Sequence, residues 1–382
     1  MYFCNVKKTL LYEISIIRPL VIFLLVFYHS LCVFTGGWTA PAGVPSNAFY
    51  WWLGHLVSGF RIEAIAFVGG YVFCYQCVER GRRSPLPAFI WKKFKRLIIP
   101  CFIFGALYYL LFLFHPDRFR WNVFFWRLAN GVSHLWFLPM LFWCFLVCWL
   151  ADRLLSLLSA RSRGWTLAVG WLLFALFAVA SLFRVTGLRM GFTRLNYFMF
   201  YFYLGYWLRF LLPALRRKIR PAVHPLASSW LLPVLLWLFY LVFLYLHYQV
   251  THLRLPGFGF DCPSFLRGWS HTALHLVTLG HTACGILALY TTVMLWLRRH
   301  RTADAQPGPW LRQCSRLCYG VYVLHMFLLQ YLLYYTSLPQ WCCALPSGEW
   351  LLPWVLLLPA VALSALGTWL LLKTRFGRFL IG

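Results

Sequence analysis

Long apolar runs, separated by short polar stretches, follow one another along the whole chain. Ten of them are long enough to cross about 30 Å of hydrocarbon as a helix. They lie near residues 14–34, 52–78, 97–114, 135–150, 165–183, 195–212, 229–248, 273–297, 317–335 and 350–372. No linker rich in Gly, Ser or Pro divides them. The pattern predicts an all-α, polytopic integral membrane protein with about ten transmembrane helices, built as a single domain over residues 1–382.

Composition agrees with this interpretation. Hydrophobic residues make up 62% of the chain and charged residues 11%, with a mean hydropathy of +0.70. An ordinary soluble domain carries roughly 25% charged residues, so that class is excluded. The first apolar run is too long for the core of a signal peptide and no small-residue cleavage site follows it. It is therefore predicted to be a membrane span.

The placement of the basic residues predicts the orientation. The formal net charge is +27, and most of the 35 lysines and arginines fall in alternate loops. These loops hold the clusters at 7–8, 80–96, 153–163, 209–220, 298–316 and 373–378. Because such residues favour the cytoplasmic side, both termini are predicted to be cytoplasmic. The charge then orients the chain and contacts the lipid bilayer, and no nucleic-acid partner is expected.

Two polar side chains stand inside the first span. Arg18 and His29 are eleven positions apart, so on a helix they lie about 20° apart around the axis and about 16 Å apart along it. Arg18 alone could extend to the headgroups, and His29 alone could bond a neighbouring helix. A cation and an imidazole on one face of an apolar helix are a candidate functional pair.

The second span contains Arg61 and Glu63 near its middle, with His55 nearer the outer face. Positions two apart point to different sides of a helix, so Arg61 and Glu63 are not expected to pair with each other. Each needs a partner on another helix or a water-filled cavity, and a buried structural pairing is the plainer alternative. Gly69 and Gly70 further along would allow a neighbouring helix to approach closely.

Polar residues also mark three later segments. Lys92, Lys93, Lys95 and Arg96 lie where the third span enters the membrane, and are either an ordinary cytoplasmic anchor or a site for a phosphate-rich cofactor. His134 and Trp136 open the fourth span, at the predicted outer interface. Tyr319, Tyr322 and His325 recur every three residues in the ninth span, where the plainer interpretation of His325 is a satisfied core histidine. His271, His275 and His281 in the eighth span are interpreted as packing or hydrogen-bonding residues.

The thirteen cysteines do not form a metal-binding pattern, because most lie in apolar spans and no pair of CxxC motifs occurs. No metal is therefore expected. Cys262 and the adjacent Cys342 and Cys343 fall in predicted outer loops, where a disulfide remains open. The longest outer loops, about 115–134 and 249–272, are rich in aromatic and basic residues and suit a polar or anionic partner outside.

Five motifs in order resemble those of the membrane acyltransferase family 3. They are Arg18 with His29, the run from Phe60-Arg61 to Gly70, the basic segment ending at Pro100, HLWFL from His134, and SRLCYGVYVLH ending at His325. The second motif, which begins FRIE, and the fourth motif, HLWFL, are most similar to those of the branch that includes glucan succinyltransferases and other polysaccharide acyltransferases. The chain departs from the family's pattern at Gly69, at Glu63 and in lacking an extracytoplasmic esterase-like domain, and this last absence implies direct transfer to the acceptor.

The resemblance implies an enzyme of the cell membrane, plasma or inner, that moves an acetyl or succinyl group from cytoplasmic acyl-CoA to a hydroxyl of an envelope or exported glycan. No tightly bound cofactor is implied. His29 would act as general base or form an acyl-histidine, with Arg61, Glu63 and His325 in the same catalytic centre. Arg18 and the cluster Lys92, Lys93, Lys95 and Arg96 would hold acyl-CoA. His134, Trp136, Tyr319 and Tyr322 would receive the acceptor. The alternatives are a transporter or flippase of a glycan or lipid-linked sugar and, with less support, a receptor or scaffold.

Overall fold

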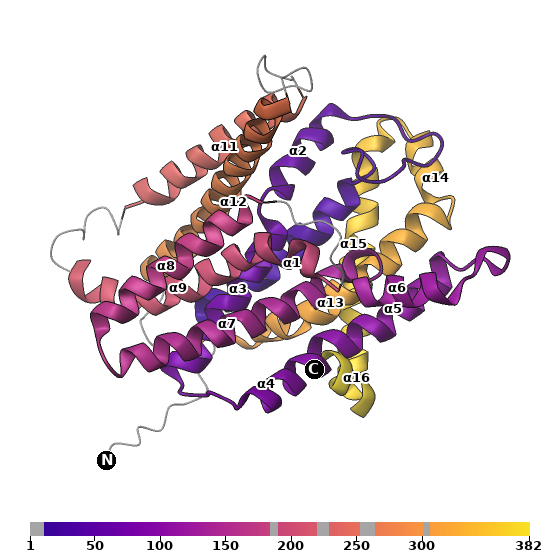
Figure 1. Ribbon diagram of the computed structural model, residues 1–382. Helices are drawn as coiled ribbons and strands as arrows, with labels where there is room; N and C mark the ends of the chain where they lie inside the picture. Colours follow the sequence, from indigo (N-terminus) through magenta and orange to yellow (C-terminus); the bar gives the residue numbers. More distant parts are fainter. Residues whose placement is uncertain (1–10, 184–189, 220–228, 253–263, 301–305) are drawn as a thin grey trace.

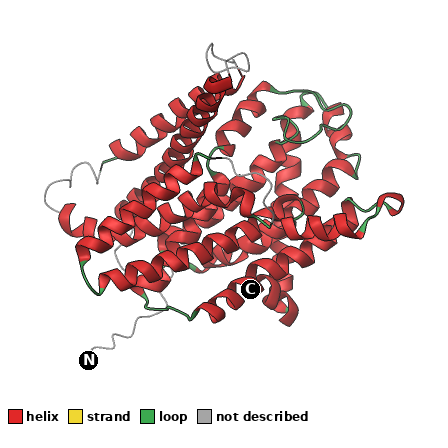
Figure 2. Ribbon diagram, in the orientation of Figure 1, coloured by secondary structure: helices red, strands yellow, loops and turns green. Residues whose placement is uncertain are grey.

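The computed structural model describes residues 11–183, 190–219, 229–252, 264–300 and 306–382, with side chains omitted at 213–219, 249–252 and 264–273. In these ranges the chain is helical and contains no strand (Figures 1 and 2). The all-α prediction is confirmed. The predicted outer segment 249–272, Cys262 and the side chain of His271 lie outside the residues whose side chains are described.

The helices differ widely in length, and several segments predicted as one span consist of two or three pieces. The α-helices are α1 (Tyr12–Leu31), α2 (Ala48–Ser58), α3 (Arg61–Cys74), α4 (Leu86–Lys93), α5 (Ile99–Phe112), α6 (Trp121–Asn130), α7 (Phe137–Ser159), α8 (Arg163–Ser181), α9 (Leu195–Ile219), α11 (Leu231–His252), α12 (Ser264–His300), α13 (Pro309–Tyr334), α14 (Leu338–Ala344), α15 (Gly348–Lys373) and α16 (Arg375–Ile381). The π-helical turns η1 (Tyr75–Glu79) and η2 (Phe94–Ile98) follow α3 and α4, and the 3₁₀ turns are η3 (Pro116–Arg118), η4 (Ser133–Trp136) and η5 (Phe192–Arg194).

Nine helical stretches of the described chain are long and apolar enough to cross a membrane. The tenth predicted span, 195–212, lies in α9, which has 25 residues but is not among the nine. Its tyrosines, with Asn196 and Arg209, lower its hydropathy. α9 nevertheless lies deep in the bundle, because Tyr201, Tyr203 and Tyr206 are fully buried. A helix surrounded by protein does not need an apolar surface all round.

The centre of the bundle is a close contact between α3 and α9. A Cβ atom added at Gly70 would overlap the backbone of Phe202, and one added at Gly205 would overlap the backbone of Phe67. The two backbones therefore touch where glycine removes the side chain, which is the usual device for close helix packing in membranes. This confirms the expectation for Gly70. α1 packs against α3, α12, α13 and α15, so the first predicted span is central as well (Figure 1).

The second predicted span is broken at Gly59 and Phe60, directly before Arg61. Phe60 has φ −146° and ψ −4°, which ends the hydrogen-bond ladder of α2 before α3 begins. Free carbonyls inside a membrane protein must find other donors. Three side chains supply them: Tyr240 to Leu56, Arg61 to Ser58 at 2.6 Å, and Thr282 to Gly59 at 2.7 Å. The break is thus fixed by α11, α12 and the arginine itself.

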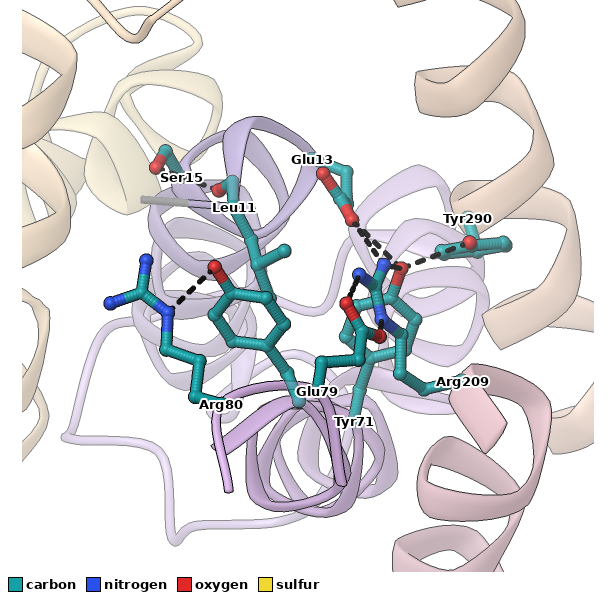
Figure 3. A network of polar contacts seen from close by, with 9 residues as sticks. Leu11, Glu13, Ser15, Tyr71, Glu79, Arg80, Arg209 and Tyr290 are labelled. Carbon is teal, nitrogen blue, oxygen red and sulfur yellow. Dashed lines mark hydrogen bonds and ion pairs between the residues drawn. The ribbon is translucent and has the colours of Figure 1, made fainter. Parts of the chain in front are cut away.

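A network of polar contacts ties five helical segments together at one end of the bundle (Figure 3). Arg209 of α9 forms ion pairs with Glu79 of η1 and with Glu13 of α1, the latter at 3.3 Å. It also donates at 2.8 Å to the hydroxyl of Tyr71, which donates to Glu13 and contacts the hydroxyl of Tyr290 of α12. We call this network the Arg209 clamp. The sequence pattern placed Arg209 among the loop charges, but it is buried in a helix because two carboxylates surround it.

The clamp lies at the end of the bundle that carries the basic loop 80–85 and helix α4, which we call the basic end. A second ion pair, from Arg83 to Asp152 at 2.9 Å, joins that loop to α7. At the opposite end, the predicted 115–134 loop forms η3 and α6. Cys342 and Cys343 of α14 are free thiols, so no disulfide joins them.

Candidate active site

Three imidazoles from three separate elements meet inside the bundle. His29 comes from α1, His325 from α13 and His134 from η4. The ring of His325 is 5.2 Å from that of His29 and 5.0 Å from that of His134, measured between centroids. His325 and His134 are buried, whereas His29 is partly exposed. Of the three residues, His29 is therefore the one with partly exposed surface.

The hydrogen bonds of the three rings fix where their protons lie. Nδ1 of His325 is 3.0 Å from the carbonyl of Val321, which only accepts, so Nδ1 carries the proton. Nε2 of a neutral His325 then accepts, and Nδ1 of His29 donates to it across 3.1 Å. The remaining nitrogen of His29, Nε2, is left with a lone pair. In this pair, His29 can act as a general base and His325 can orient it.

His134 was expected at the outer interface, and the structure adds that its side chain is buried: the 3₁₀ turn η4 places it beside α13. Its Nε2 donates to the carbonyl of Val323 at 3.1 Å, and its own carbonyl accepts from the Tyr322 hydroxyl at 2.6 Å. Nδ1 of His134 is buried and has no hydrogen-bonding partner among the described residues.

Aromatic rings and a guanidinium surround His29 on its other sides. Trp38 stacks on His29, with centroids 5.7 Å apart and ring planes within 6°. Arg61 lies over the ring of Tyr28, 3.5 Å from its centroid, and close enough to His29 to interact electrostatically. Although only 7% of its surface is exposed, Arg61 forms none of the ion pairs in the described chain. Its charge is thus available to a group bound beside His29.

Glu63 lies on the side of Arg61 that faces α9. The Tyr197 hydroxyl donates to Oε1 of Glu63 at 3.3 Å, while Oε2 is enclosed and has no partner in the described chain. As the sequence indicated, no ion pair joins it to Arg61. Tyr201, one turn along α9, interacts electrostatically with Glu63, and its hydroxyl also interacts with the side chains of Tyr197 and Thr282.

The basic residues lie toward the basic end. Arg18 is partly buried, has no ion-pair or hydrogen-bonding partner in the described chain, and interacts electrostatically with Arg96. The four residues of the predicted phosphate cluster differ: Lys92 and Arg96 are exposed, whereas Lys93 lies 3.1 Å from the centroid of Phe145 and Lys95 lies 5.4 Å from that of Trp91. Arg18 and Arg96 are therefore the two cations that interact with each other, and we call them the cationic pair; Lys92 is exposed as well.

Pro100 explains how α13 is attached to this cationic pair. A proline has no N–H, so the carbonyl four residues earlier, that of Arg96, lacks its helical donor. The hydroxyl of Tyr319 donates to it at 2.7 Å. Tyr319, Tyr322 and His325 consequently form a stripe of hydrogen-bonded groups on α13. It begins beside Arg96 and ends at His29, about 9 Å further along the helix.

Some residues are not where the sequence suggested, and some were missed. Trp136 lies under the guanidinium of Arg194, at 3.9 Å, and packs on Phe198 rather than on any of the three imidazoles. Trp38 and Tyr201 were missed because aromatic residues are frequent throughout the chain. Glu13 and Asp152 could have been found, since few acidic residues stand inside apolar runs.

In the described part of the chain, no three His, Cys, Asp or Glu side chains are arranged to hold a metal ion. The three imidazoles use nitrogens on one another or on backbone carbonyls.

Comparison with known proteins identifies the family. A family model described as an acyltransferase domain, Acyl_transf_3, matches residues 11–373. The chain belongs to membrane acyltransferase family 3. No curated protein and no solved structure matches it. The matched region contains every residue of the candidate site, so the three imidazoles and the cationic pair all belong to the acyltransferase domain.

Proposed function

We propose that this acyltransferase moves an acyl group, acetyl or succinyl, from cytoplasmic acyl-CoA to a hydroxyl of an envelope or exported glycan. The protein would lie in the plasma or inner membrane, with its basic end in the cytoplasm. The observation that carries the proposal is the hydrogen bond from His29 to His325, because it leaves Nε2 of His29 with a lone pair inside a membrane bundle.

The proposed reaction needs only the two substrates and side chains of this protein. Nε2 of His29 takes the proton of the acceptor hydroxyl while the hydroxyl oxygen attacks the thioester carbonyl carbon. Arg61 stabilises the negative oxygen that forms, as a cation does in a dry site. The carbon–sulfur bond then breaks, and the proton on His29 passes to the departing thiolate to give free CoA. His325 accepts the Nδ1–H of His29 throughout and stabilises the transient imidazolium.

The positions of the cations support acyl-CoA as the donor. Arg18 is about 16 Å from His29 along the same helix face, and Arg96 joins it from η2. Phosphates held by this pair would place an extended pantetheine arm along the Tyr319, Tyr322 and His325 stripe. Lys92, Lys93 and Lys95 contribute positive potential around the entrance. The thioester end then reaches His29.

The same lone pair on His29 could instead attack the thioester directly and give an acyl-histidine. The two routes predict different partial reactions. A covalent intermediate releases one equivalent of CoA per enzyme before any acceptor is added, whereas direct transfer releases CoA only with acceptor present. Direct transfer is the route we propose, because the hydrogen bond to His325 sets up a base. A stoichiometric burst of CoA without acceptor would replace it by the covalent route.

The test is transfer of label from acetyl-CoA and succinyl-CoA to envelope glycans in membranes that contain the intact chain, His29→Ala or Arg61→Ala. General-base loss lowers rates by about 10²- to 10⁴-fold, so labelling should nearly disappear in His29→Ala. His55→Ala is the matched control, because that ring bonds its own helix at Trp51. Equal labelling in His29→Ala and His55→Ala would show that His29 is structural.

A transporter or flippase remains the second candidate, and the break between α2 and α3 is the observation that favours it. Discontinuous helices are typical of transporters, where they occur in corresponding positions of two inverted repeats. No internal repeat is evident in the sequence. Failure of every acyl-CoA to label any glycan, with the protein intact in the membrane, would favour the transporter.

A further inference from the structure

We propose that Trp38 shields His29 from water, so that the site uses a sugar hydroxyl and not water as the acyl acceptor. This rests on the proposed function and adds to it the residue that decides between these two acceptors. Trp38 acts through His29, so it is a positioning residue and not a catalytic one.

A general base in an acyltransferase needs protection from water. Nε2 of His29 carries a lone pair, and it can take a proton from water as well as from a sugar hydroxyl. The water oxygen would then attack the thioester carbonyl carbon and the carbon–sulfur bond would break. The proton on His29 would pass to the thiolate, which gives CoA and the free acid. Transfer to a glycan therefore requires that water is excluded from the base.

The segment after α1 supplies a cover for His29. The helix ends at Leu31, two residues beyond His29, so α1 itself does not cover the ring on that side. Residues 32–39, which we call the cover turn, fold back toward the helix, and the N–H of Trp38 donates to the carbonyl of Cys32 at 3.1 Å. Gly36 has φ +73°, in the left-handed region that glycine adopts readily, which allows the chain to reverse there.

The cover turn approaches both groups of the proposed chemistry. The rings of Trp38 and His29 are parallel within 6° and their centroids are 5.7 Å apart, which is an offset stack. This stack covers part of one face of the imidazole and does not block the ring edge, where the lone pair of Nε2 lies. A Cβ atom added at Gly37 would lie 3.5 Å from the hydroxyl of Tyr28, whose ring carries Arg61. The turn thus borders the base and the cation together.

Contacts with other helices hold the cover turn in place. The hydroxyl of Tyr334, on α13, donates to the carbonyl of Thr39 at 2.9 Å. The side chain of Trp38 is partly buried, and it packs against the main core and also against a second apolar cluster that includes Tyr108 and Met326. The cover turn is therefore attached to the helix that carries His325, and the stack on His29 is fixed from both sides.

The first test compares hydrolysis with transfer. The full chain in lipid nanodiscs receives acetyl-CoA or succinyl-CoA in oxygen-labelled water, with and without envelope glycan. Labelled free acid reports hydrolysis, and acylated glycan reports transfer. The ratio of hydrolysis to transfer should rise about tenfold in Trp38→Ala, the upper end of what one aromatic pair contributes. Trp38→Phe keeps a ring on His29 and should recover part of the loss.

Trp341→Ala is the matched control. It makes the same change on α14, where the side chain is 73% exposed, so the ratio should equal that of the intact chain. A tryptophan that only packs would lower the melting temperature and the amount of active protein, but it would leave the ratio of hydrolysis to transfer unchanged.

The second test needs no substrate. Diethyl pyrocarbonate modifies neutral imidazoles that it reaches from solution, and mass spectrometry gives the rate at each histidine. The exposed His115, before η3, serves as the internal reference. Modification of His29 relative to His115 should be about tenfold faster in Trp38→Ala than in the intact chain, because loss of one aromatic pair favours opening by up to that factor. It should be unchanged in Trp341→Ala.

A second pair of variants loosens the cover turn without changing Trp38, which keeps the proposal testable if Trp38→Ala does not fold. Tyr334→Phe removes the hydrogen bond to Thr39, and modification of His29 should become about two- to fivefold faster. Tyr335→Phe is the control, because that hydroxyl donates to the carbonyl of Phe112 at 3.5 Å and not to the cover turn.

The outcomes separate the shield from the proposed function. If modification of His29 depends on Trp38 while no acyl-CoA is turned over, the shielding stands and the acyltransfer proposal fails. Where the intact chain transfers acyl groups, both the ratio and the modification rate must rise in Trp38→Ala. If either stays at the level of the intact chain, the function stands and the role given to Trp38 is wrong.

Discussion

Charges are buried in two regions of this protein, and they form ion pairs in one region but not in the other. In the Arg209 clamp one guanidinium meets two carboxylates and a tyrosine hydroxyl (Figure 3). Around His29, neither Arg18, Arg61 nor Glu63 takes part in any ion pair of the described chain. Burying a charge is costly in both places. Paired charges hold helices together, whereas the unpaired charges are the ones that we propose for binding and transforming the substrates.

Removing the clamp should have the largest effect on stability. Breaking a buried ion pair by deleting one partner costs about 3–5 kcal/mol, because the other charge is left uncompensated. Arg209→Ala removes the ion-pair partner of both Glu13 and Glu79, so we expect the free energy of unfolding to fall by this amount. The fraction of intact protein after heating in detergent, compared with Arg209→Lys, measures it. A melting temperature equal to that of the intact chain would mean that the clamp does not stabilise the bundle.

His325 should affect catalysis more than stability. Its Nε2 accepts from His29 and stabilises the imidazolium, and a hydrogen bond to a charged group contributes about 1.5–3 kcal/mol. His325→Ala should therefore lower kcat roughly 10- to 150-fold with little change in the KM for acyl-CoA.

His325→Gln serves as the control, since its side-chain carbonyl is still able to accept from His29 and should recover part of kcat. If Gln behaves like Ala while both variants melt early, His325 is a packing residue and does not orient the proton of His29.

Substitution of Arg18 should have the smallest of these effects, and it should change only the binding of acyl-CoA. Because it has no partner in the described chain, Arg18→Gln should not lower stability as Arg209→Ala does. Loss of one phosphate contact should raise the KM for acyl-CoA roughly tenfold. This is the lower end of the range for hydrogen bonds to charged groups, because Arg18 is partly exposed. Arg118→Gln, at an exposed position of η3 at the opposite end of the bundle, should leave this KM unchanged. A destabilised Arg18→Gln would instead place Arg18 with the structural charges.

The sequence anticipated some contacts and not others. Arg18 and His29 were placed on one face by helix geometry alone, and Gly70 was expected to allow a close approach. The resemblance placed His29 and His325 in one catalytic centre, but their hydrogen bond was not predictable, since nothing in the two spans indicates how α1 and α13 pack. The burial of His134 was not predicted, because it depends on the 3₁₀ turn η4, which hydropathy does not detect. Arg209 was counted as a loop charge because its carboxylate partners lie far away in the sequence.

By itself the sequence determined that this is a helical membrane protein, and its motifs indicated the family to which the family model assigns it. These properties follow from hydrophobic run length and local spacing, which act within one helix at a time. Only the tertiary structure decided which charges are paired and which imidazole nitrogens keep a free lone pair. Those properties depend on distances of a few ångströms between helices. Such distances are set by how glycines, prolines and broken helices let the backbones approach, and no single span encodes them.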